Sequence, residues 1–96
     1  MHLVPSLPEL RVDNGDSAEL QCVLVGNSIH GGSFTWTGPA VGTNEDDHTT
    51  TTLSDSGTVS TLTIHGVGRD DAGQYTCSYS GLNSISITLV VIGKLL

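Results

Sequence analysis

Apolar and polar side chains alternate in short stretches along this chain, and this alternation restricts its possible folds more than any other feature. Successive side chains of a strand point to opposite faces, so a period of two is typical of strands with one buried face. No window carries a sustained apolar stripe at helical spacing. The sequence therefore predicts an all-β fold of roughly seven to nine short strands. The apolar members of the alternating stretches are Ala18, Leu20, Cys22 and Leu24; Phe34 and Trp36; Leu62 and Ile64; Tyr75, Cys77 and Tyr79; and Ile85, Ile87, Leu89 and Val91.

Three further segments give weaker strand signals. Leu3–Pro8 contains two prolines, which cannot donate to a strand ladder, so it predicts an edge strand or a bend. Glu9–Val12 predicts a second short piece. Val41–Ser56 holds four consecutive threonines and predicts one or two short edge strands.

The length of 96 residues predicts a single domain spanning 1–96, with its core between about 5 and 92. No signal peptide is visible, and the longest apolar run, Leu89–Ile92, is far too short to enter a bilayer. We expect the domain to be excised from a larger polypeptide.

The charge balance excludes several classes of partner. The chain has 3 Lys and Arg against 10 Asp and Glu, for a formal net charge of −7. Nucleic acids, heparin-like polymers and anionic membranes each need a basic patch. Aromatic residues make up only 4% of the chain, which argues against a stacking surface for bases.

The two cysteines, Cys22 and Cys77, occupy inward positions of separate predicted strands. A bridge between them would contribute about 4 kcal/mol in the chain-entropy model and would indicate a secreted or cell-surface protein. The alternative is a pair of buried free thiols in a cytosolic domain.

Several motifs, in order, resemble the immunoglobulin superfamily. They are Leu20-Gln21-Cys22, Trp36, Leu62-Thr63-Ile64 and the run Asp71-Ala72-Gly73-Gln74-Tyr75-Thr76-Cys77. The resemblance implies a two-sheet antiparallel β-sandwich with Greek-key connections and one inter-sheet disulfide between Cys22 and Cys77. It favours the disulfide over free thiols, and with it an extracellular, cell-surface location.

The resemblance also implies roles for individual residues. Trp36 would pack on the disulfide, together with Leu20, Leu62 and Ile64 in the core. The Tyr75 hydroxyl would bond back to the backbone a few residues upstream. Asp71 would accept hydrogen bonds in that turn, and Gly73 would adopt a conformation that a Cβ strains.

The subtype resembles the intermediate or constant-like sets rather than antibody variable domains. The cysteines are close together for a variable domain, and a Phe-Gly-x-Gly segment is missing. The corner Asp71 also lacks an arginine entering the fourth strand, since the basic residues are Arg11, Arg69 and Lys94. The segment 26–32 is predicted to form an extended loop.

No arrangement of residues indicates catalysis, a cofactor or a metal. No nucleophile elbow is present, and the four histidines, at positions 2, 30, 48 and 65, lack ligand spacing. Glu45-Asp46-Asp47 reads as a solvated loop rather than a calcium site. The sequence predicts a domain that is not an enzyme and holds no cofactor.

Function is therefore expected from a surface. The outward residues of the sheet formed by the third, sixth and seventh family strands are almost uncharged and are the first candidate for a protein interface. The two loops at the end of the sandwich, with Ile29 and Leu82, are the second. The candidate interface comprises Thr35, Thr37, Gln74, Thr76, Ser78, Thr88, Val90, Ile29 and Leu82.

The resemblance leaves two functional classes open. The first is a protein-binding module of a cell-surface adhesion protein, with homophilic contacts through this face and neighbouring immunoglobulin-like domains in the parent chain. The alternative is a ligand-binding or spacer domain of a signalling receptor, or a unit of an intracellular muscle-type array.

Overall fold

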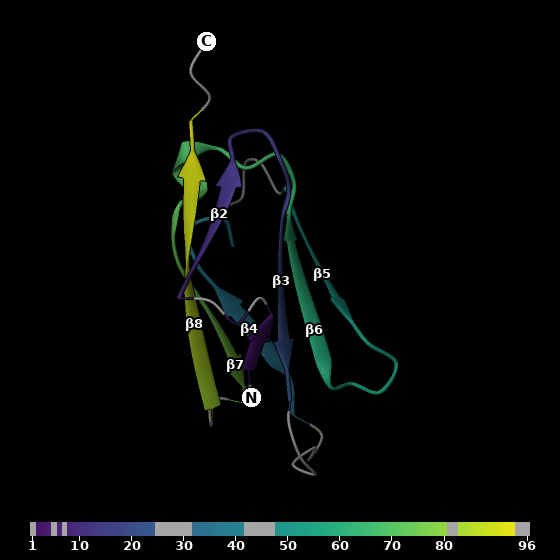
Figure 1. The fold of residues 1–96 in the computed structure, drawn as a ribbon. Coiled ribbons are helices and arrows are strands. Elements are labelled where there is room, and N and C mark those ends of the chain that lie inside the picture. The colour runs from purple at the N-terminus through teal and green to yellow at the C-terminus, as the bar shows by residue number, and fades with distance from the viewer. Residues whose placement is uncertain are drawn as a thin grey trace.

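Two four-stranded sheets pack face to face in the computed structural model, which describes residues 2–4, 6, 8–24, 32–41, 48–80 and 83–93 (Figure 1). The first sheet has the order β1-β3-β6-β5. The second has the order β2-β8-β7-β4. The predicted all-β sandwich is confirmed. The strands are β1 (His2–Val4), β2 (Glu9–Asp13), β3 (Ala18–Val23), β4 (Phe34–Thr37), β5 (Thr49–Leu53), β6 (Val59–Ile64), β7 (Gly73–Tyr79) and β8 (Asn83–Ile92).

The chain moves repeatedly between the two layers. Strands β3 and β6 are hydrogen-bonded neighbours, although β4 and β5 lie between them in the sequence and β4 belongs to the other sheet. This crossing gives the Greek-key connectivity that the resemblance implied. It also means that both layers are built from segments distant in sequence.

The N-terminal segment is divided between the sheets. Strand β1 pairs antiparallel with β3, whereas β2 pairs parallel with β8. Pro5 and Pro8 lie between the two halves, where a continuous ladder would need their missing N–H groups. The expectation of antiparallel sheets therefore holds for the other strand pairs, and β2–β8 is a parallel exception.

The core lies between the sheets and follows the period of two. Leu20, Leu62 and Ile64 have no exposed surface, and Cys22 is joined to Cys77 across the layers. The predicted inter-sheet disulfide is confirmed. Ile87 and Leu89 complete the buried side of β8, as the alternation indicated.

The segment 41–56 gave the least clear strand prediction, and in the described part of this segment the structure has one strand, β5. It lies at the edge of the first sheet, and four of its five residues are exposed. A strand with so little burial has no strong hydrophobic alternation, which explains its weak signal in the sequence.

Candidate protein-binding face

The outer surface of β4, β7 and β8 forms a flat face of uncharged side chains, which we call the β4–β7–β8 face. Residues paired across neighbouring strands share a side, so the register places the outward-facing residues in one layer. It contains all the candidate contact residues of the sheet that the sequence identified. Its members are Thr35, Thr37, Gln74, Thr76, Ser78, Ser84, Ser86, Thr88, Val90 and Ile92.

Thr76 occupies the centre of this face. It lies opposite Thr37 on β4 and opposite Ser86 on β8. The Thr76 and Ser86 hydroxyl oxygens are 2.8 Å apart and share a hydrogen bond. The centre of the face therefore consists of short hydroxyl side chains that leave the sheet surface flat.

Strand β2 adds a charged border that the sequence did not place here. In the parallel register Glu9 lies beside Thr88, Arg11 beside Val90 and Asp13 beside Ile92. Arg11 Nη2 is 3.0 Å from Glu9 Oε1. The expected lack of charge concerned the outward residues that lie on β4, β7 and β8, and those residues are uncharged; the charges of β2 lie beside them. The register of a separate edge strand is set by the fold rather than by its own alternation.

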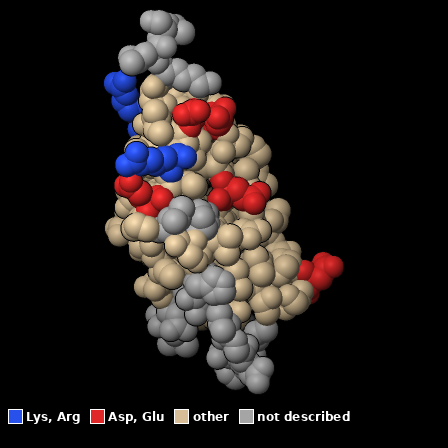
Figure 2. All heavy atoms as spheres, in the orientation of Figure 1, with Lys and Arg blue, Asp and Glu red and all other residues tan. Residues whose placement is uncertain are grey.

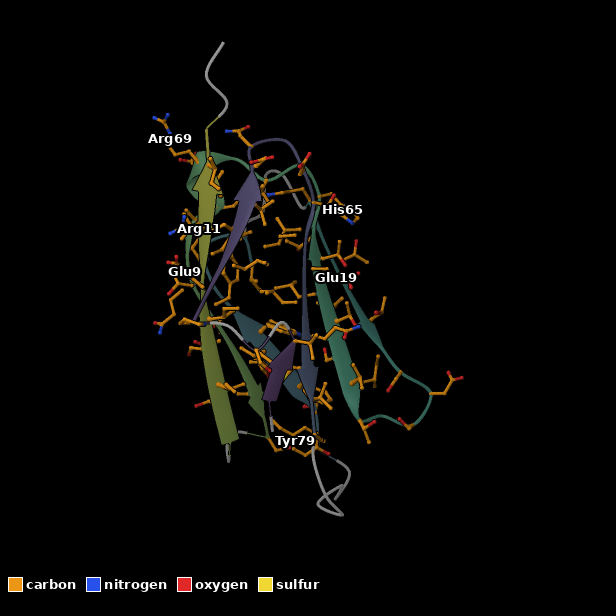
Figure 3. The ribbon with its side chains drawn as sticks, viewed as in Figure 1. Glu9, Arg11, Glu19, His65, Arg69 and Tyr79 are labelled. Carbon is orange, nitrogen blue, oxygen red and sulfur yellow. A yellow bond between two sulfur atoms is a disulfide. The ribbon has the colours of Figure 1, made fainter. Side chains whose placement is uncertain are left out.

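In the view of Figure 2, most of the visible charged side chains lie on one half of the molecule. The basic groups and most of the acidic groups that are visible in this view lie toward the end where β2 and β8 finish. In Figure 3, Glu9 and Arg11 project from the outer side of the second sheet, whereas Glu19 and His65 belong to the first. The strand partners of Thr76 in the second sheet, Thr37 and Ser86, are uncharged.

The two apolar residues of this face differ in exposure. Val90 is half-buried beside Arg11, and Ile92 is 42% exposed at the end of β8. The long aliphatic stem of an arginine can cover a neighbouring apolar side chain. Ile92 is thus the more available apolar contact of the pair.

A hydrogen-bonded corner fixes the entry into β7. The fully buried Tyr75 hydroxyl donates to the Asp71 carbonyl oxygen at 2.6 Å and accepts from the Ala40 N–H at 3.1 Å. Burial raises the pKa of the Tyr75 hydroxyl to about 12, and the hydrogen bond from Ala40 opposes this shift only in part. Gly73 has a φ of 141°, and a Cβ there would lie 2.8 Å from Pro39 Cγ. The corner therefore joins three backbone segments through one side chain.

His48 completes the corner, and sequence reasoning missed it. Its Nε2 lies 3.0 Å from both carboxylate oxygens of Asp71, which also accepts the Gly68 N–H at 2.8 Å. The resemblance pointed to an arginine as the partner of Asp71, and a histidine takes this place. A basic residue directly before an expected edge strand was the available signal. The pair attaches the start of β5 to the turn before β7.

Trp36 lies next to the disulfide, as the resemblance implied. It pairs with Cys77 across β4 and β7, and it is 7% exposed. Its indole Nε1 donates to Ser60 Oγ at 2.9 Å, which links the two sheets. This bond satisfies both buried polar groups, and the alternation pattern carried no sign of it.

The described residues form no group of three His, Cys, Asp or Glu side chains that could hold a metal ion. No helix in the described part of the chain has the length and apolar character needed to cross a bilayer. The remaining candidates of the sequence, Ile29, Leu82 and the acidic run Glu45-Asp46-Asp47, lie outside the described residues.

Comparison with known proteins identifies similar domains. The family model described as "Immunoglobulin domain" matches residues 2–80. A titin fragment, I-band I67–I69, is 27% identical over 88% of this chain with a TM-score of 0.71, and the chain spans 30% of its length.

Two single domains are also similar in fold. The Ig1 domain of mouse SynCAM 2 is 22% identical, with 91% of this chain and 93% of that domain covered and a TM-score of 0.74. The ZIG-8 IG1 domain, solved as a homodimer, is 18% identical, with 94% of this chain and 83% of that chain covered and a TM-score of 0.71.

Proposed function

The chain belongs to the immunoglobulin domain family, and we propose that it is a non-catalytic protein-binding module of a cell-surface adhesion or recognition protein. The contact surface in this proposal is the β4–β7–β8 face, and the partner is a second copy of the domain. The chain would stand beside similar domains in a longer polypeptide. The Cys22–Cys77 disulfide supports an extracellular location, because such bonds persist in oxidising compartments.

The observation that carries the proposal is an uncharged sheet face on a chain of net charge −7. Two copies with this charge repel each other over most of their surfaces. A face without carboxylates can approach its own copy without placing like charges in contact. At the border of that face, Glu9 is already paired with Arg11. This arrangement keeps unpaired charge away from the centre at Thr76.

The area of one sheet face fits a weak contact. Such a face buries roughly 600–800 Å² per partner, the lower end of the range for specific interfaces. We expect self-association in the micromolar range, which many copies on a membrane would strengthen through multivalency. A homodimer also occurs for the ZIG-8 domain of similar fold.

The test is sedimentation analysis over a wide range of protein concentration. Thr76→Arg would bring two like charges together at the centre of a two-fold dimer and should abolish association. Thr61→Arg is the matched control, because Thr61 is a half-buried residue on the outer side of the other sheet. It should dimerise like the wild type. A Thr76→Arg protein that retained wild-type affinity would contradict the proposed face.

A spacer role is the second candidate, and the similarity to the titin fragment favours it. Domains of that kind would be held in line by their neighbours and need no exposed contact face. A wild-type domain that stays monomeric at millimolar concentration, with freely alkylated thiols in the native protein, would support this role and contradict the homophilic one.

A further inference from the structure

Strands β4 and β5 are edge strands on the same side of the sandwich. In the described part of the chain, β4 pairs only with β7 and β5 pairs only with β6. Between these two edge strands lies a groove of about 580 Å³. Ligand pockets usually fall within about 300–1,000 Å³. The apolar and aromatic side chains that line the groove include Phe34, Trp36, Val41, Leu53 and Tyr79, and Thr51 lies beside them on β5. No charged residue belongs to the described lining.

The backbone of β5 presents hydrogen-bonding groups to this side. His48 O accepts from His65 N–H, and Ser54 N–H donates to Val59 O, so the even-numbered residues of the strand face β6. Antiparallel pairing alternates, and the N–H and C=O groups of the residues between them point the other way. Thr51 and Leu53 therefore direct their backbone groups to the open edge.

Strand β5 also lacks the features that usually protect an edge. Thr49–Leu53 contains no proline, no lysine and no other charged residue. Natural proteins commonly use such residues to stop edge strands from pairing with other chains. Leu53 lies on the inward side of the strand, opposite Ser60, and is still 61% exposed. An apolar side chain is thus left uncovered at the mouth of an apolar groove.

We propose that β5 accepts an extended peptide segment of a partner protein as an additional strand, with apolar side chains at alternate positions entering the groove. The open N–H and C=O groups of Thr51 and Leu53 require a strand-like occupant, since only an extended backbone offers donors and acceptors at that spacing. The uncharged lining matches uncharged side chains, and the net charge of −7 disfavours an acidic segment. A second copy of this chain at the same edge is an outcome that the test distinguishes. This site adjoins the β4–β7–β8 face along β4, where Thr35 belongs to both, whereas Thr76 at the centre of that face is not part of the groove lining.

A capped seven-residue peptide in which valine alternates with threonine is a suitable probe. Binding should change the fluorescence of Trp36, the one tryptophan of the chain, because its side chain lines the groove. In isotope-labelled protein, the amide signals of Thr51 and Leu53 should shift and become protected from exchange. A matched peptide, N-methylated at the residues that face Thr51 and Leu53, should bind about tenfold or more weakly, because it keeps the side chains and loses the donors.

Two variants test the edge from the protein's side. Thr51→Pro removes one open N–H, which an edge strand tolerates because that group does not pair with β6. Leu53→Lys keeps the backbone and places a charge at the groove. Both should fold with a cooperative transition and bind the peptide about tenfold or more weakly. Thr76→Arg should bind it like the wild type, so failure here and failure of the proposed dimer are distinguishable.

Three results would overturn the proposal. The first is an unchanged Trp36 signal and unchanged Thr51 and Leu53 amides at millimolar peptide. The second is equal binding of the N-methylated peptide or of both variants. The third is a shift of the same two amides with protein concentration in the absence of peptide, which would assign the edge to a second copy.

Discussion

Replacing Tyr75 by phenylalanine tests the corner that fixes the entry into β7. The change keeps the buried ring and removes only the hydroxyl. Two hydrogen bonds disappear together, one to the Asp71 carbonyl at 2.6 Å and one from the Ala40 N–H at 3.1 Å. Both bonds are buried, so water cannot simply take the place of the lost oxygen.

The expected loss in the free energy of unfolding follows from these two hydrogen bonds. A buried polar group that loses its partner costs about 1–3 kcal/mol, and the sequence alone accounted for one such bond. With two bonds lost around a fully buried ring, we expect Tyr75→Phe to lower the free energy of unfolding by about 2–4 kcal/mol. That is a large part of the stability of an ordinary domain.

The dependence of stability on alkaline pH is a second test of the Tyr75 hydroxyl. The folded pKa of Tyr75 is about 12 and the usual value is 10.0, so the hydroxyl must stay protonated in the folded state. The contribution of this protonated hydroxyl to the free energy of unfolding is complete below pH 10 and is lost as the pH rises from 10 to 12. The loss can reach about 2–3 kcal/mol in the wild type. Tyr75→Phe should lack this decline.

The assay is guanidinium unfolding followed by the fluorescence of Trp36, at neutral pH and between pH 9 and 12. Tyr79→Phe is the matched control, because its hydroxyl accepts a single part-buried hydrogen bond from Gly32. It should cost about 0.5–1.5 kcal/mol. If Tyr75→Phe unfolds at the wild-type midpoint, or declines equally at high pH, the reasoning about the corner is refuted.

Two further predictions concern the links between segments. His48→Ala should lower the free energy of unfolding in urea by about 1.5–3 kcal/mol. His48→Arg should recover most of this loss, because a guanidinium can bond both Asp71 oxygens. Equal loss in both variants would contradict the pairing of His48 with Asp71. Reducing Cys22–Cys77 should lower stability by about 4 kcal/mol in the chain-entropy model, and an unchanged midpoint with verified free thiols would contradict it.

The strands and the core could be predicted because they depend on local alternation. Leu20, Leu62 and Ile64 are inward by the period of two, and each is fully buried. The corner run from Asp71 to Cys77 could be located because its residue types are unusual together. These signals need no knowledge of which strands are neighbours.

The features that sequence missed all depend on contacts between distant segments. The parallel pairing of β2 with β8 brings Glu9 and Arg11 beside the hydroxyl-rich face, and no pattern within 9–13 specifies that neighbour. His48 meets Asp71 across 23 residues, and Trp36 meets Ser60 across 24. Each such pair is fixed by how the two sheets stack, which a local pattern does not contain.

The two sides of the sandwich differ in how their edges are protected, and this difference directs association. On one side Pro8 directly precedes β2, and β2 carries charges at Glu9, Arg11 and Asp13. Prolines and charges of this kind oppose pairing with another strand. On the other side β4 and β5 are uncharged, and Thr51 and Leu53 direct their backbone groups away from β6. Among the described edges, pairing by backbone hydrogen bonds is therefore favoured on the side of β4 and β5, while contact by side chains is left to the β4–β7–β8 face. Because Thr51 and Leu53 lie in the other sheet from Thr76, we expect occupation of the β5 edge to leave the centre of the β4–β7–β8 face available, with Thr35 as the residue that borders both contacts.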